Sequence, residues 1–443
     1  MIILVLIIAF HSWLLTKLNL FPYPELFVYP YLAENGLLPY KQIFDQHFPS
    51  LLMTPFNFYD LGLRNPESAR LFLIGSVVIT HLILFLISRK LLTNFIYLIV
   101  QPLFEGYILW LDTFLAPILL LAFYFSQKIV HEKKDEYAIF TGLFLGLALF
   151  FKQVMFPLYI AVGIYIFYKT RSLRNTAIYF ITGAIPLLLT ILWIFSKSLL
   201  PDFWYWAVQF NFEVYSKLGR KLPTFTQLAR VVVFFLPAFY VVLARFKKEK
   251  DFLLSGIFLV FSLFTAVSRF EFVHLQPALP FVALLTAYFI ISKLKYRVAT
   301  LAIITITTIV WLPVFYKKSV GNRIYFFEPE TIKTAQVVNS LTFKTDSIFI
   351  LGAQPVIYPL SDRLPSGKVF SVNLPWNMKV AEDKILQGLD KDKPKIIVRD
   401  PSATIDGKKV TDFTQKIDMF IDSKYIKQGE IGNNEILIYT RDN

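Results

Sequence analysis

The stretch "YPELFVYPYLAENGLLPYKQIFDQHFP", residues 23–49, follows directly on a hydrophobic N-terminal segment and combines acidic residues with aromatics and prolines. Its polar residues include Glu25, Asp45 and His47. A carboxylate that is partly desolvated at a membrane surface has a raised pKa and can act as a general base. The stretch is therefore a candidate site if the rest of the chain is a membrane protein.

The composition indicates a polytopic membrane protein. Of the 443 residues, 56% are hydrophobic and 17% aromatic, and apolar runs recur along residues 1–316. The formal net charge of +14 could indicate nucleic-acid binding, so its distribution matters. Residues 1–319 hold 28 Lys and Arg against 15 Asp and Glu, whereas residues 320–443 hold 17 against 16. The excess positive charge belongs to the membrane part, and we expect no nucleic-acid partner.

The basic residues gather in short loops between apolar segments: "SRK" (88–90), "QKIVHEKKDE" (127–136), "KTRSLR" (169–174), "RFKKEKD" (245–251) and "KLKYR" (293–297). This distribution is typical of cytoplasmic loops. It predicts about eleven transmembrane helices with the N-terminus inside, near 1–16, 68–87, 91–104, 107–126, 138–152, 154–168, 175–196, 227–244, 252–268, 275–292 and 298–316.

This topology places the loops 17–67 and 197–226 on the external side, together with 269–274 and the chain after Tyr316. Both longer loops are rich in aromatic residues, so we expect them to form amphipathic helices in the membrane interface. In the first loop, Phe27, Tyr31 and Leu32 would face the membrane. The N-terminal segment lacks a basic region and a cleavage site, so it is interpreted as a retained helix of a multi-pass plasma-membrane protein.

Residues 320–443 have the pattern of a soluble extracytoplasmic α/β domain, following a transmembrane domain over 1–319. "PETIKTAQVVNSL" and "FTQKIDMFIDSKY" predict helices, and "DSIFILG" and "KPKIIVRD" predict buried strands. "GEIGNNEILIYTR" predicts a hairpin that turns near Gly432. The chain has no cysteine, which excludes disulfides and thiolate metal sites.

Three basic residues outside the first loop are functional candidates. Lys152 interrupts apolar sequence after "GLALFF", and an ionisable residue at membrane depth is a functional candidate by default. Arg269 and His274 begin the external end of a predicted helix in "RFEFVHLQP". The alternatives are a lysine that snorkels to the headgroups and an interface anchor. Glu105 and Asp112 flank "GYILWL", and either a cavity lining or an ion pair at a helix end would explain them.

The first external loop resembles that of the GT-C glycosyltransferases. The shared features are an acid just after the first helix, a short helix closing on "NGLLPY", and the segment "DQHFP". "GLFLGLALFFKQ" (142–153) and "RFEFVHLQPALPFVALLTAY" (269–288) are also similar to segments of this group. It includes the dolichyl-phosphate-mannose protein mannosyltransferases and the bacterial aminoarabinose transferase that acts on lipid A.

The resemblance implies an inverting hexosyl or pentosyl transferase that moves a sugar from a polyprenyl-phosphate donor to an acceptor hydroxyl at the outer membrane face. By position, Glu25 is the base, and Asp45 orients the acceptor, orients a partner cation or forms a structural salt bridge. The family more often has an Asp-Glu pair where this chain has a single acid in "PYPEL". The leaving lipid phosphate needs fixed cations, for which the candidates are His47, Lys152, Arg269 and His274.

The sequence holds no Gly-rich phosphate loop and no zinc or serine hydrolase motif. A lipid-phosphate donor requires no nucleotide site, so we expect no cofactor and no protein metal site, with a divalent cation left open. The expected partners are the lipid-linked donor, membrane lipids and a lipid, glycan or protein acceptor. The alternative function is a lipid or polysaccharide transporter without transferase activity, and a structural anchor for the C-terminal domain explains the helices less well.

Overall fold

The computed structural model describes residues 1–132, 134–245, 250–292, 294 and 296–440. Parts of three predicted cytoplasmic loops, 127–136, 245–251 and 293–297, lie outside the described residues. The chain forms two compact units. The helical unit comprises Met1–Phe21, Glu67–Ile191 and Lys221–Arg323, and the α/β unit comprises Pro22–Pro66, Leu192–Arg220 and Ile324–Asn443. Both long loops that were predicted to be external thus group with the C-terminal part of the chain, whereas the sequence suggested two consecutive domains.

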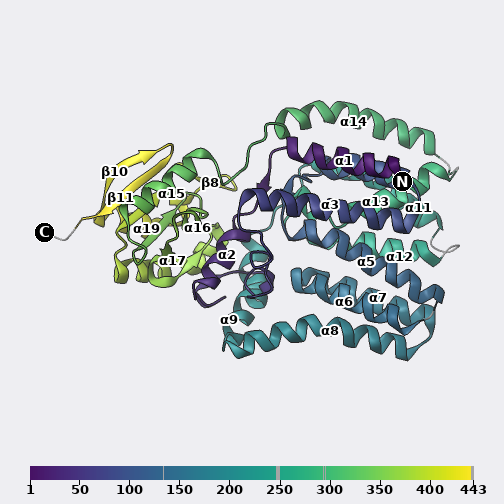
Figure 1. Ribbon diagram of the computed structural model, residues 1–443, viewed down its shortest axis with the longest axis horizontal. Coiled ribbons are helices and arrows are strands. Elements are labelled where there is room, and N and C mark those ends of the chain that lie inside the picture. The colour runs from purple at the N-terminus through teal and green to yellow at the C-terminus, as the bar shows by residue number, and fades with distance from the viewer. Residues whose placement is uncertain (133, 246–249, 293, 295, 441–443) are drawn as a thin grey trace. The chain divides into compact units, whose positions relative to one another are not determined.

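The helical unit consists of helices that run side by side (Figure 1). A helix lies over each of the eleven predicted apolar segments: α1 (Ile2–Lys17), α3 (Pro66–Ser88), α4 (Leu91–Leu103), α5 (Leu111–Glu132), α6 (Asp135–Phe151), α7 (Phe156–Thr170), α8 (Leu173–Ser196), α11 (Phe225–Arg245), α12 (Lys250–Ser262), α13 (Leu279–Ile291) and α14 (Arg297–Ser319). Within the described ranges, five of them are long and apolar enough to cross a membrane, namely α3, α5, α8, α11 and α14. The number of crossings stays a prediction.

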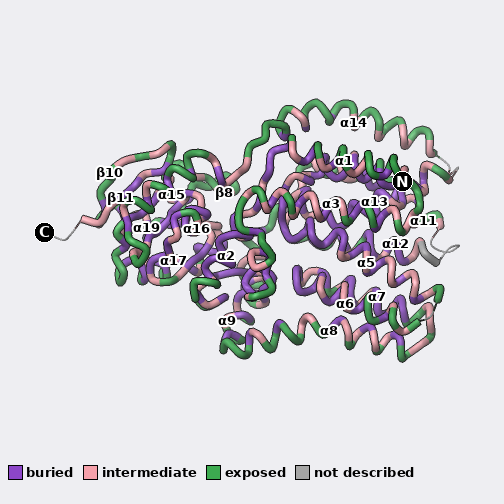
Figure 2. The backbone as a smooth tube through the Cα atoms, viewed as in Figure 1, coloured by how far each residue is buried: buried purple, intermediate pink, exposed green. Residues whose placement is uncertain are grey.

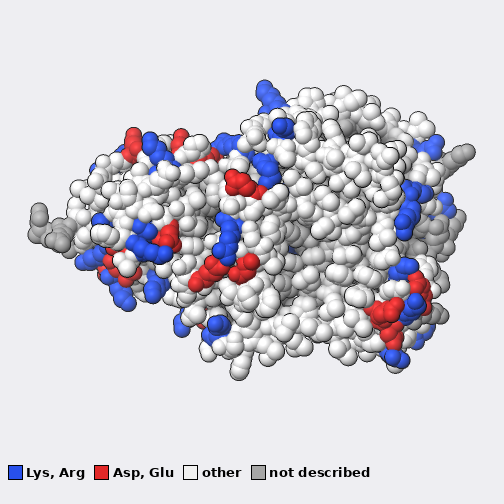
Figure 3. Space-filling view, in the orientation of Figure 1, with Lys and Arg blue, Asp and Glu red and all other residues white. Residues whose placement is uncertain are grey.

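The surface of the helical unit is apolar where lipid would contact it. Helices α8 and α14 have many exposed positions (Figure 2). Apolar residues such as Leu188, Ile306 and Ile309 are among the exposed ones. Charged side chains gather at one end of the helices and leave a broad uncharged surface (Figure 3). Residues of the predicted cytoplasmic loops form ion pairs with one another. These pairs are Lys128–Glu132, Lys134–Glu132 and Arg174–Asp135. The chain is therefore a polytopic helical membrane protein.

The α/β unit is built on a five-stranded sheet in the order β10-β11-β7-β4-β5. Strands β4 and β7 are parallel to each other, β5 is parallel to β4, and β11 is antiparallel to β7 and β10. The strands are β4 (Ser347–Leu351), β5 (Leu364–Pro365), β7 (Ile396–Arg399), β10 (Tyr425–Ile431) and β11 (Asn434–Tyr439). Helices α15 (Pro329–Leu341), α16 (Ile357–Ser361), α17 (Pro375–Asp392), α18 (Val410–Phe413) and α19 (Gln415–Lys424) complete the C-terminal part.

The predicted elements of this C-terminal part are confirmed at α15, β4, β7, α19 and the β10-β11 hairpin. Helix α17 was not predicted, although its buried side chains Ala381, Ile385 and Leu389 recur every four residues. The remaining strands are the short β1 (Phe21–Pro22), β2 (Ile43–Phe44), β3 (Ile108–Leu109), β6 (Phe370–Ser371), β8 (Thr404–Ile405) and β9 (Lys408–Lys409).

The first predicted external loop forms helix α2 (Glu25–Glu34), and most side chains of this helix are buried within the protein. The prediction that Phe27, Tyr31 and Leu32 face the membrane is wrong, because all three are buried. Phe27 packs edge-on against Phe327, and the Tyr31 hydroxyl donates to Asp362 Oδ1 at 3.1 Å. Side chains on every side of α2 are apolar and buried, as expected of a helix inside a protein core.

The loop is joined to the C-terminal part by backbone pairing as well as by side chains. Strand β2 pairs in parallel with β6, and the Phe370 N–H donates to the Gln42 carbonyl at 2.7 Å. The second loop contributes α9 (Leu200–Trp204) and α10 (Ser216–Leu218), and Tyr215 contacts Trp376. These contacts explain why distant loops form one unit with residues that follow the last long helix.

Close packing of α6 against α8 makes a stability prediction. A Cβ atom at Gly146 would lie 2.2 Å from the Gly183 carbonyl oxygen, and backbone cannot rotate away. We expect Gly146→Ala to lower the free energy of unfolding by about 1–3 kcal/mol. Gly75→Ala on α3 is the matched control, since nothing lies within 4 Å of its Cβ position. Thermal unfolding of the two purified variants measures the difference, and equal melting temperatures would contradict this packing.

Candidate functional site

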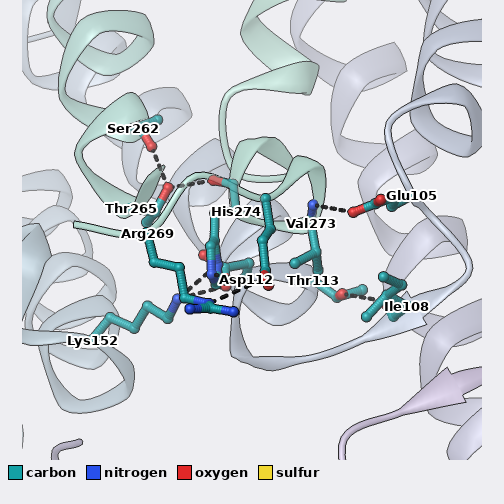
Figure 4. A network of polar contacts seen from close by, with 11 residues as sticks. Glu105, Ile108, Asp112, Thr113, Lys152, Ser262, Thr265, Arg269, Val273 and His274 are labelled. Carbon is teal, nitrogen blue, oxygen red and sulfur yellow. Dashed lines mark hydrogen bonds and ion pairs between the residues drawn. The ribbon is translucent and has the colours of Figure 1, made fainter. Parts of the chain in front are cut away.

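A buried ion-pair cluster in the helical unit is centred on Asp112 (Figure 4). Lys152 Nζ lies 2.5 Å from Asp112 Oδ2, and His274 Nδ1 lies 2.8 Å from the same oxygen. Lys152 Nζ and His274 Nδ1 are 3.4 Å apart. The side chain of Asp112 is fully buried and that of Lys152 is 8% exposed. The lysine therefore does not snorkel to the membrane surface, and its charge is balanced inside the protein.

The chain places Lys152 by breaking a helix. Helix α6 ends at Phe151, and Lys152 has an extended backbone with φ −146° and ψ 118°. A 3-10 turn (Gln153–Met155) follows, and α7 starts with Pro157 in its first turn. Proline in the first turn needs no N–H donor, whereas it would disrupt a continuous helix. The break turns the lysine towards Asp112, at the start of α5.

Arg269 and Lys221 extend the cluster through Glu271. Arg269 Nε and Lys221 Nζ lie 3.0 and 3.1 Å from Glu271 Oε1, and His274 Nε2 lies 4.0 Å from Glu271 Oε2. Burial alone would raise the pKa of Glu271, but Arg269, His274 and Lys221 lower it below its ordinary value. Thr265 fixes the histidine backbone by donating to the His274 carbonyl.

Glu105 lies next to this cluster and differs from Glu271 in its ionisation. Its Oε2 accepts from the Val273 N–H at 3.3 Å. Burial, assisted by the charge of Glu271, raises the pKa of Glu105 to about 7. Glu105 therefore neutralises the cations less than an ordinary glutamate would, and the cluster keeps more positive than negative charge at neutral pH.

A second set of polar residues lies in the α/β unit, on the first external loop. His47 Nδ1 donates to Asp45 Oδ1 at 2.8 Å. The Asp45 side chain is 2% exposed and that of His47 is 25% exposed, so the pair presents its histidine side to solvent. The two residues are two apart in the sequence, directly after strand β2, where the chain bends at Gln46 and His47. Oδ2 of Asp45 is buried and accepts no hydrogen bond from the residues that the structure describes.

Glu25 occupies the first turn of α2, directly after Pro24. Its Oε2 is shielded from solvent and has no hydrogen-bond partner among the described parts of the chain. Burial raises the pKa of Glu25 to about 7; its own backbone N–H and His47 oppose the rise, and the charge of Asp45 adds to it. A carboxylate with this pKa is partly ionised at neutral pH and can accept a proton from a hydroxyl.

The predicted site residues thus fall into two groups. Glu25, Asp45 and His47 belong to the α/β unit, whereas Lys152, Arg269 and His274 belong to the helical unit. From the sequence, Asp112 was interpreted only as a cavity lining or a helix-end ion pair. In the structure Asp112 is the centre of the second group. Glu271 and Lys221 were missed, although Glu271 lies inside the quoted "RFEFVH". In the residues that the structure describes, no three His, Cys, Asp or Glu side chains are grouped to hold a metal ion.

Comparisons with known proteins identify the fold. The family model described as dolichyl-phosphate-mannose-protein mannosyltransferase matches residues 58–195, less than half of the chain. ArnT from Cupriavidus metallidurans bound to undecaprenyl phosphate has a TM-score of 0.63 at 11% identity, over 100% of this chain and 98% of that chain. The same protein in the apo state gives 0.64 at 12%, over 98% and 97%.

An oligosaccharyltransferase from Archaeoglobus fulgidus, tethered to an acceptor peptide with the NVT sequon, has a TM-score of 0.51 at 10% identity, over 99% of this chain and 74% of that chain. A comparison with curated proteins gives no match. Structural similarity at 10–12% sequence identity establishes a shared fold and nothing more. The chain has the GT-C fold of membrane glycosyltransferases, as the first external loop predicted.

The burial of the Lys152–Asp112 pair predicts that breaking it destabilises the protein more than breaking an exposed pair does. Lys152→Met removes the lysine partner of Asp112 and leaves His274 as its ion-pair partner among the described residues, so we expect a loss of about 3–5 kcal/mol in the free energy of unfolding. Lys152→Met combined with Asp112→Asn should recover part of this loss, because no unpaired charge stays buried. The control Lys128→Met breaks an exposed pair and should change little. Thermal unfolding of purified protein measures all three, and equal effects at Lys152 and Lys128 would contradict the burial of the pair.

Proposed function

We propose that this chain is an inverting glycosyltransferase that moves a sugar from a polyprenyl-phosphate donor to an acceptor hydroxyl at the outer face of the membrane. The observation that carries the proposal is Glu25, a shielded carboxylate with a pKa of about 7 on the first loop of a chain with the GT-C fold. A general base is most effective when its pKa lies near the working pH.

Glu25 takes the proton of the acceptor hydroxyl as the acceptor oxygen attacks the anomeric carbon. The bond between that carbon and the phosphate oxygen breaks, and the polyprenyl phosphate leaves with the electron pair. Attack from the side opposite the phosphate inverts the configuration of the anomeric carbon. Asp45 supports this step in two ways: it orients His47 through the 2.8 Å bond, and its charge raises the pKa of Glu25.

The proposed role of Lys152, Arg269 and His274 is to stabilise the negative charge that develops on the leaving phosphate. Each is hydrogen-bonded or ion-paired to a carboxylate, so the cations are fixed before the substrate arrives. Preorganised cations stabilise developing charge without a cost of reorganisation during the reaction. His47 is a further proposed phosphate ligand because its ring is partly exposed.

The chemistry of this cluster supports the proposed donor class, as does the shared fold of the neighbour that was solved with undecaprenyl phosphate. We propose a plasma-membrane location with the α/β unit on the outer side, since the basic loops lie between the helices of the helical unit and the first loop carries the proposed base. The acceptor is a lipid, a glycan or a protein. The proposed reaction requires no nucleotide, and the participation of a divalent cation is left open.

Replacing the proposed base tests the function. We expect Glu25→Gln to reduce transfer of radiolabelled sugar from a mixed pool of polyprenyl-phosphate sugars by about 10²- to 10⁴-fold at equal protein level. Glu34→Gln is the matched control, because Glu34 ends the same helix and pairs with Arg64 at the surface. Unchanged transfer by Glu25→Gln would assign the base to another acid. Transfer by neither wild type nor control with any donor would favour the transporter.

The pH dependence of transfer gives an independent test. Because the base must be ionised, kcat/KM should fall below pH 7, about tenfold per pH unit. Asp45→Asn removes a negative charge that raises the pKa of Glu25, so its acidic limb should move to lower pH. Initial rates in overlapping buffers from pH 5 to 9 measure both profiles. A limb that stays in place, or moves to higher pH, would contradict the proposed coupling.

A further inference from the structure

The second external loop contains an unusual helical segment over Leu200–Leu218. Between α9 and α10, two π-helical turns follow each other, Tyr205–Gln209 and Asn211–Tyr215. The sequence predicted a single amphipathic helix over this loop, and the structure differs by these two turns. A π turn lets a backbone N–H bond to a carbonyl five residues back, as the Phe210 N–H does with Tyr205. Such turns are rare and occur frequently at functional sites.

Asn211 connects the π turns to the first external loop. Its Nδ2 lies 3.0 Å from the Ala207 carbonyl oxygen, within its own segment. The same nitrogen lies 2.8 Å from the Gln46 carbonyl oxygen, 165 residues away in the sequence. A side-chain amide nitrogen carries two hydrogens, so Asn211 can donate to both carbonyls at once. An aspartate or leucine in its place could donate to neither.

Further contacts fix the same short piece of backbone. Trp206 stacks on Phe44, with ring centroids 4.9 Å apart and an interplanar angle of 17°, and both side chains are buried. The Tyr40 hydroxyl donates to the His47 carbonyl at 2.9 Å. The backbone is thus held before, between and after the positions of the Asp45–His47 pair. None of these contacts involves the carboxylate or the imidazole itself.

We infer that Asn211 is a positioning residue of the transferase, which sets the geometry of the Asp45–His47 pair by holding the Gln46 carbonyl. The inference rests on the proposed function in that it assigns the pair a part in sugar transfer. In this role Asn211 need not touch the substrate or the reacting atoms. Its effect passes through the backbone between Asp45 and His47. Trp206 stabilises the position of Phe44, the residue before Asp45, by stacking on its ring.

The test compares Asn211→Leu with wild type in sugar transfer and in the reactivity of His47. We expect kcat to fall by about 10- to 100-fold with KM for the donor unchanged, because small displacements of catalytic groups reduce the rate strongly. Diethyl pyrocarbonate should modify His47 several-fold faster in the variant. Peptide mass spectrometry follows that modification, with the exposed His131 as an internal reference.

Gln209→Leu is the matched control, because it also replaces an amide of this segment, and that amide donates to the exposed Glu213. Asn211→Asp replaces Asn211→Leu if the latter does not accumulate. Wild-type kcat and a wild-type rate of His47 modification would overturn the inference, as would equal effects at Gln209. If wild type transfers no sugar, the proposed function fails, and the rate of His47 modification alone decides whether Asn211 positions the pair.

Discussion

A charged group inside an apolar helical bundle must be paired, and this constraint organises the helical unit. Asp112 is fully buried, and it accepts from both Lys152 and His274. The desolvation of any one of these groups alone would cost several kcal/mol. Meeting the requirement brings together the start of α5, the break between α6 and α7 and the segment before α13. Helix packing and the cationic cluster therefore depend on the same bonds.

The α/β unit shields the Glu25 carboxylate from water without an ion pair to a lysine or arginine in the described residues. Helix α2 is buried on all sides, and the shielded Oε2 of Glu25 lies at its first turn. The nearby negative charge of Asp45 acts in the same direction as burial, and both raise the pKa of Glu25. A paired glutamate such as Glu271 has the opposite shift. The two acids show how the surroundings of a carboxylate, rather than its residue type, decide between a base and a counter-ion.

Local signals in the sequence predicted much of this. The lengths of the apolar segments predicted the long helices, and the position of a charged residue within an apolar segment identified Lys152 as a candidate. The partner of that lysine lies 40 residues away, and no local pattern encodes such a distance. Likewise, the apolar faces of α2 were assigned to lipid because protein and lipid surroundings select the same side chains. The π turns depend on long-range contacts such as the bond of Asn211 to Gln46.

The most direct test of the account is the anomeric configuration of the transferred sugar. A synthetic polyprenyl-phosphate sugar of one defined anomeric configuration is incubated with the purified protein and an acceptor, and the product is examined by NMR. Direct attack of a hydroxyl activated by Glu25 predicts the opposite configuration in the product. Retention of the donor configuration would require a covalent intermediate or a second displacement, and it would contradict the single-base mechanism.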